Sequence, residues 1–174
     1  MIDGIAFTID EQTLISGTAY DGTVRLWDLA NGSLMQKWRV FKEGHMSNLC
    51  LAISPDGTLL ATAGNNAMAW LWRIADGELL RVARTEKAHS TWTIVFSPSG
   101  RIFATGGFDG KVRLWRVADG TLLHTLEGHR GQRDPITRQL DFSGGIFRLA
   151  WSPDGQSLAS AGDTTVRVWH TPQA

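Results

Sequence analysis

Residues 109–115 read Asp109-Gly110-Lys111-Val112-Arg113-Leu114-Trp115, and variants of this stretch recur three times in the 174-residue chain. The other copies lie at residues 21–27, 66–72 and 163–169, and each of them also ends in tryptophan. The four tryptophans follow one another at intervals of 43 to 54 residues. Self-similarity at such a period predicts a repeat architecture, in which each repeat is one structural unit.

The third repeat shows how one unit is built. Residues 93–96 are a short apolar run that ends at a Ser-Pro-Ser-Gly turn, and we expect residues 101–105 to form a second strand after it. Residues 121–126 follow an Ala-Asp-Gly turn and are expected to form the fourth strand. Between them, residues 111–115 alternate apolar and polar side chains, which is the two-residue period of a half-buried strand. Since no segment has a helical period, we expect an all-β protein made of antiparallel hairpins.

These repeats resemble the WD-repeat β-propeller family along essentially the whole chain. The Trp-Asp pair that names the family stands at residues 27–28, and its opening Gly-His pair stands at 44–45 and 128–129. The resemblance implies a single repeat array over residues 1–174, folded as a β-propeller of four antiparallel blades without helices. The expected blades span about residues 4–40, 46–84, 91–127 and 146–170, and the last one lacks its outer strand.

In this family a His, a Ser or Thr, an Asp and the Trp of each blade form a hydrogen-bonded tetrad. The resemblance therefore implies structural tetrads here, of which the first lacks a histidine and the second has Asn in place of Asp. Their members are Ser16, Asp21 and Trp27; His45, Thr62, Asn66 and Trp72; His89, Thr105, Asp109 and Trp115; and His129, Ser160, Asp163 and Trp169. Histidines that recur at the same register in the blades indicate a buried structural position, not a metal ligand or a catalytic base.

Arginine recurs two residues before three of the four tryptophans, as Arg25, Arg113 and Arg167. A ring of arginines is one way to bind phosphate. We expect instead that their aliphatic stems pack against neighbouring aromatic rings.

The connection at residues 130–145 is an inserted loop, about 14 residues longer than its counterparts in the other repeats. Long loops on rigid scaffolds often carry recognition, and arginine and aromatic side chains are enriched at binding hot spots. A tolerated surface insertion is the open alternative for this loop. The candidate partner-binding residues are Arg130, Arg133, Arg138 and Phe142 in this loop, together with Tyr20, Trp92 and Phe108, for which simple packing is the alternative.

Composition narrows the functional classes. The chain has 17 basic and 17 acidic side chains, a balance that argues against binding to nucleic acid or to acidic membranes. Its sequence has no apolar run long enough for a membrane helix. Cys50 is the only cysteine, which excludes an intrachain disulfide and disfavours a cysteine-based zinc site, so a reducing cytoplasm is the simplest location. We expect no metal and no cofactor.

The fourth repeat ends just after its third strand, and Met1–Asp3 are too few residues to supply a fourth. An unpaired strand at residues 165–169 would expose an edge rich in valine, which invites pairing. We therefore expect the chain either to be part of a longer protein or to assemble with a second copy, or with another WD-repeat chain, that completes the ring.

These observations favour a non-catalytic protein–protein interaction scaffold. The alternative is a regulatory or docking module of a larger signalling or effector enzyme. We do not expect an enzyme in its own right, because no phosphate loop, paired carboxylates or Cys-His pair stands outside the repeat register.

Overall fold

The computed structural model describes residues 2–41, 49–64, 68–84, 90–130 and 144–171. Across these residues the chain forms 15 β-strands in four antiparallel sheets, without a helix. This part of the chain accordingly holds no helix that could cross a membrane. The prediction of an all-β fold with four propeller-type blades is confirmed.

Strand order in each sheet follows the chain, so every strand pairs with its neighbour in sequence. The first blade contains β1 (Gly4–Phe7), β2 (Thr13–Thr18), β3 (Thr23–Asp28) and β4 (Leu34–Arg39). The second contains β5 (Leu49–Ile53), β6 (Leu59–Gly64), β7 (Met68–Arg73) and β8 (Leu79–Arg84). The third contains β9 (Thr91–Phe96), β10 (Ile102–Gly107), β11 (Lys111–Arg116) and β12 (Leu122–Glu127). The fourth contains three strands, as predicted: β13 (Ile146–Trp151), β14 (Ser157–Gly162) and β15 (Thr165–His170).

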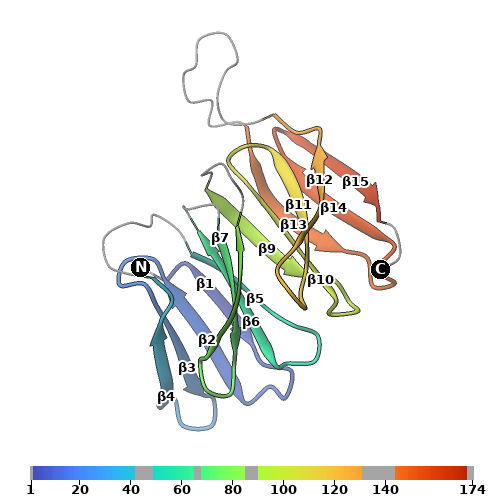
Figure 1. The fold of residues 1–174 in the computed structure, drawn as a ribbon. Helices are drawn as coiled ribbons and strands as arrows, with labels where there is room; N and C mark the ends of the chain where they lie inside the picture. The colour runs from blue at the N-terminus through green and yellow to red at the C-terminus, as the bar shows by residue number, and fades with distance from the viewer. Residues whose placement is uncertain (1, 42–48, 65–67, 85–89, 131–143, 172–174) are drawn as a thin grey trace.

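The blades follow one another along an arc, with the first and the fourth blade at its two ends (Figure 1). β1 lies beside β5, β5 beside β9, and β9 beside β13. Neighbouring blades therefore meet chiefly through their first strands, and the outer strands of each blade lie farther from these contacts.

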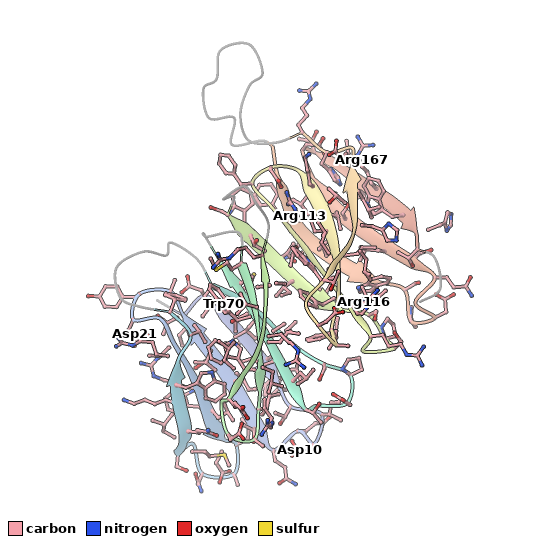
Figure 2. All side chains as sticks on the ribbon, viewed as in Figure 1. Asp10, Asp21, Trp70, Arg113, Arg116 and Arg167 are labelled. Carbon is pink, nitrogen blue, oxygen red and sulfur yellow. The ribbon has the colours of Figure 1, made fainter. Side chains whose placement is uncertain are left out.

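Three clusters of buried side chains fill the spaces between the blades. In the cluster between the first two blades, Ile15 and Leu60 are fully buried. Figure 2 labels Trp70 on β7 of the second blade, and the centroid of its ring lies 6.4 Å from that of Phe41. The second cluster includes Ala61, Leu71, Phe103 and Trp115, and the third includes Val112, Leu114, Ile146 and Leu158. Burial of these apolar surfaces is the main term that holds consecutive blades together.

Side-chain hydrogen bonds in the Ser-Pro-Asp-Gly turns help to close the first hairpin of a blade. In the second blade, Ser54 Oγ donates to Asp56 (2.5 Å) and accepts from the backbone amide of Leu59 (2.9 Å). Gly57 has a φ of 73°, a left-handed conformation that glycine adopts at little steric cost. The chemistry of this turn thus sets the point at which the chain folds back.

The turn between β14 and β15 differs from its counterparts. It contains Asp163 and Thr164, whose φ angles are 41° and 66°. The first and third blades have glycine at the position of Thr164, namely Gly22 and Gly110, with φ angles of 64° and 70°. A β-branched side chain at such a φ is strained, whereas glycine is not.

Thr164→Gly is therefore expected to raise the free energy of unfolding by about 0.5–1 kcal/mol, after allowing for the entropy that glycine adds to the unfolded chain. Urea denaturation measures this difference. Thr125→Gly on β12 is the matched control, because the same change in an ordinary strand backbone should destabilise the protein. A loss of stability in Thr164→Gly would contradict the strain argument.

Candidate functional site

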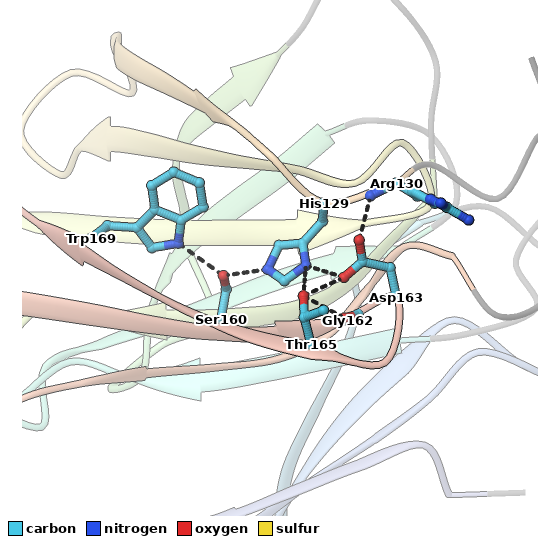
Figure 3. Close-up of polar contacts among 7 residues, drawn as sticks. All are labelled: His129, Arg130, Ser160, Gly162, Asp163, Thr165 and Trp169. Atoms are coloured by element: carbon cyan, nitrogen blue, oxygen red, sulfur yellow. Dashed lines mark hydrogen bonds and ion pairs between the residues drawn. The ribbon is translucent and has the colours of Figure 1, made fainter.

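A continuous chain of hydrogen bonds in the fourth blade joins β15 to the segment that follows β12 (Figure 3). Trp169 Nε1 donates to Ser160 Oγ (2.8 Å), and Ser160 Oγ lies 2.7 Å from His129 Nε2. His129 Nδ1 lies 2.5 Å from Asp163 Oδ1. The serine hydroxyl accepts from the indole, so its oxygen joins the tryptophan to the imidazole, and the imidazole joins the serine to the carboxylate.

Asp163 is ionised in this network. Burial alone would raise the pKa of its carboxyl. Hydrogen bonds from His129, from the backbone amide of Arg130 (2.8 Å) and from the Thr165 hydroxyl (2.7 Å) outweigh burial and lower the pKa to about 2. The carboxylate thereby fastens the chain after β12 to the turn between β14 and β15.

The spacing of Ser160, His129 and Asp163 is that of a catalytic triad, but their surroundings differ. Ser160 is 1% exposed, and its oxygen already accepts the indole N–H of Trp169. A nucleophile must reach its substrate, which this buried hydroxyl cannot do. What the arrangement does is tie strands together.

The bond from a tryptophan to a hydroxyl recurs in the other three blades. The pairs are Trp27 to Ser16 (2.8 Å), Trp72 to Thr62 (2.9 Å) and Trp115 to Thr105 (2.9 Å). The expected members His45, Asn66 and His89 lie outside the described residues. Within those residues, the fourth blade is the one that brings all four tetrad side chains together.

Asp21 and Asp109 form ion pairs that the sequence analysis missed. The two terminal nitrogens of Arg113 lie 2.5 and 3.2 Å from the oxygens of Asp109, and both side chains are largely buried. Arg25 pairs with Asp21 at the same spacing of four residues. An ion pair at the guanidinium group does not exclude packing of the aliphatic stem, so the expected packing of Arg25, Arg113 and Arg167 against aromatic rings stays a prediction. The charged ends of Arg25 and Arg113 are each held by a carboxylate across the turn, a strong type of hydrogen bond.

Three aromatic rings gather at the junction of the third and fourth blades, and we call them the aromatic cluster: Trp92 on β9, Phe108 in the turn after β10, and Phe147 on β13. Trp92 stacks on Phe147 with centroids 5.1 Å apart and an interplanar angle of 19°. Phe108 meets the edge of Trp92 at 6.1 Å. Of these side chains, Phe147 is the most open, at 42% exposure.

Gly145 makes room for this cluster. Its φ is 88°, and a Cβ built on it would lie 2.7 Å from the ring of Trp92, so a larger residue does not fit without a shift. Its amide donates to the carbonyl of Arg130 (2.7 Å), which brings the two ends of the inserted loop together beside the cluster. The candidate residues Arg133, Arg138 and Phe142 within this loop lie outside the described residues.

The other sequence candidates fall in different places. Arg130 is exposed next to the cluster, whereas Tyr20, 86% exposed, stands on the first blade and takes no part in it. Phe147 was not among the candidates. The repeat register could have identified it, because Phe147 lies four residues before Trp151 just as Trp92 lies four before Phe96.

A family model described as WD domain, G-beta repeat matches four segments of the chain, at residues 2–28, 36–73, 80–116 and 120–170. Similarity to known proteins agrees with this match. The small ribosomal subunit protein RACK1 of Drosophila melanogaster is 31% identical over 158 residues, which are 90% of this chain and 46% of that protein.

Two further relatives share shorter segments. The small ribosomal subunit protein RACK1y of Oryza sativa subsp. japonica is 36% identical over 69 residues, or 39% of this chain and 19% of that protein. Apoptotic protease-activating factor 1 of Rattus norvegicus is 34% identical over 73 residues, or 41% of this chain and 6% of that protein. The chain spans less than half the length of each of these relatives. Because the matched segments cover most of the chain, it belongs to the WD-repeat family of β-propeller proteins.

Proposed function

We propose that the chain is a non-catalytic protein-interaction scaffold that binds partner proteins through the aromatic cluster. The observation that carries this proposal is the stack of Trp92 on the partly exposed ring of Phe147. Rigid aromatic side chains offer a large apolar contact area at a small entropic cost, and such residues dominate binding hot spots.

The surroundings of the cluster support a preformed binding surface. Trp92 and Phe147 extend from the first strands of two packed blades, so the rings are held before a partner arrives, and less ordering is required on binding. Arg130 and Arg148 are exposed, and Arg148 follows Phe147 in the chain and donates to its carbonyl oxygen (2.8 Å). Their guanidinium groups can add charge-assisted hydrogen bonds to carboxylates of the partner.

The scaffold belongs, in this proposal, to a larger propeller that another chain completes in the cytoplasm. Support comes from β15, which pairs with β14, while the third strand of each other blade pairs on both sides. An exposed strand edge of this kind favours association with further β-structure. The single cysteine suits a reducing compartment.

Phe147→Ala should weaken partner binding at least tenfold, since it removes the open ring of the stack. The probe is a set of peptides selected from a phage-displayed random library on the wild-type chain. Binding of fluorescein-labelled copies to each variant is then measured by fluorescence anisotropy. Leu122→Ala on β12 is the matched control, because Leu122 is 41% exposed and lies outside the cluster.

The proposal predicts a large loss for Phe147→Ala and none for Leu122→Ala, with melting temperatures of both variants close to that of the wild type. Selected peptides that bind Phe147→Ala as tightly as the wild type would place the recognition surface elsewhere. Equal losses of peptide affinity in Phe147→Ala and Leu122→Ala would also contradict recognition by the aromatic cluster.

A further inference from the structure

The interface between the second and third blades joins aliphatic side chains on one side, which we call the small half, to aromatic side chains on the other, which we call the large half. On the second blade, Ala61 and Leu71 are paired across β6 and β7. On the third, Phe103 is paired both with Phe96 on β9 and with Trp115 on β11. Each of these five residues is at most 9% exposed.

The outward face of the fourth blade repeats the small-residue pattern of the second. Ala159 and Val168 are paired across β14 and β15 in the register that Ala61 and Leu71 have across β6 and β7. Val166, two residues before Val168, lies on the same face. Val166 is 71% exposed and Val168 63%, whereas Leu71 is 1% exposed.

The outward face of the first blade repeats the large-residue pattern of the third. Phe7 on β1 and Trp27 on β3 stand in the register of Phe96 and Trp115, and Leu14, paired with both, takes the place of Phe103. Ile5 and Phe7 are 62% and 61% exposed. One end of the arc thus carries the small half of a blade-to-blade interface, and the other end carries the large half.

We propose that a second copy of this chain packs head to tail, with the first blade of each copy against the fourth blade of the other. This inference rests on the proposed completion of the propeller by another chain and names that chain and its contact residues. The contact uses two different faces, and its repetition at both ends of a pair closes a ring. Within the described chain, the backbones of neighbouring blades approach each other at their first two strands, and third-strand side chains such as Leu71 and Trp115 complete the interface.

Two observations favour a second copy as the occupant. Both halves of the interface stand on one chain, and they follow the pattern that already joins its second and third blades. Exposed apolar faces of this kind mark interaction surfaces in soluble proteins.

The test is the solution mass of the purified chain, measured by multi-angle light scattering over a range of concentrations. We expect twice the chain mass of 19.1 kDa for the wild type. Val168→Glu and Phe7→Glu each place a carboxylate in an apolar contact and should give the mass of one chain. Both residues are exposed in a single copy, so the fold should persist, which circular dichroism checks. Val82→Glu, at a 42% exposed valine on β8, is the control and should remain dimeric.

A mixture of the two variants makes the test sharper. Val168→Glu retains an intact first-blade face, and Phe7→Glu retains an intact fourth-blade face. An equimolar mixture should therefore regain a dimer through one intact contact, whereas each variant alone does not. A symmetric contact, which uses the same face of both copies, gives no such recovery.

Three results would overturn the inference: a wild-type chain at 19.1 kDa at every concentration, a dimer that withstands both glutamate substitutions, or a mixture that stays at the single-chain mass. The peptide-binding test of Phe147→Ala is independent of these masses. A monomeric chain that loses peptide binding in Phe147→Ala would remove the second copy and leave the scaffold proposal standing.

Discussion

Trp115→Ala is expected to lower the free energy of unfolding by about 3–5 kcal/mol, the largest loss we predict for a single substitution. Trp115 is 2% exposed and stacks on Phe103 with centroids 6.1 Å apart and an interplanar angle of 12°. Its indole also donates to Thr105, whose side chain is buried. Truncation therefore opens a cavity between two blades and leaves a buried hydroxyl without its donor.

Trp27→Ala is the matched control. Trp27 has the register of Trp115, and its indole donates to the hydroxyl of Ser16 in the same way. Trp27 lies, however, on the outward face of the first blade, where its ring is partly exposed. We expect a smaller loss, about 1–2 kcal/mol. Urea denaturation measures both variants in a Val168→Glu background, which keeps copies of the chain apart. Equal losses would contradict an uncovered face on the first blade.

The strands could be predicted from the sequence because their signals are local. β11 (Lys111–Arg116) contains the segment 111–115, in which alternation of side chains predicts a strand. Gly57 and Gly100 have positive φ angles, and both lie in turns that the preceding Ser-Pro sequences predict. Such features depend on neighbours along the chain, and they recur in every repeat.

The ion pair of Arg113 with Asp109 could not be predicted in the same way. Alternation places Arg113 on the face that carries Trp115, and this suggests packing against aromatic rings. The partner it takes depends on the shape of the turn, which returns the carboxylate to the guanidinium four residues later. In the fourth blade Asp163 is instead bound by His129, so the shared spacing alone does not determine the pairing.

The aromatic cluster was predictable only in part. Trp92 and Phe108 were candidates because of their positions within one repeat, and Phe147 belongs to the next repeat. The stack of Trp92 on Phe147 depends on how the third and fourth blades pack against each other, and the repeat period of the sequence does not determine that packing. The match of small and large end faces has the same origin, since it needs the register across whole sheets.

His129→Ala is expected to lower the free energy of unfolding by about 2–4 kcal/mol. The His129 side chain is fully buried and bridges Ser160 and Asp163 at 2.7 and 2.5 Å. Its removal leaves a cavity and takes one hydrogen bond from an ionised carboxylate. His124→Ala is the matched control, because this exposed histidine on β12 should change stability by less than about 0.5 kcal/mol. Urea denaturation measures both variants.

A double-mutant cycle with Ser160→Ala tests whether the network acts as one unit. Either substitution breaks the chain of bonds between Trp169 and Asp163, so the second should cost less in the double variant than alone. We expect a coupling of about 1–2 kcal/mol between His129 and Ser160. Strictly additive losses would mean that the two ends of the network are held independently. Asp163 would then be positioned by the amide of Arg130 and by Thr165, and the imidazole would fill space without linking the strands.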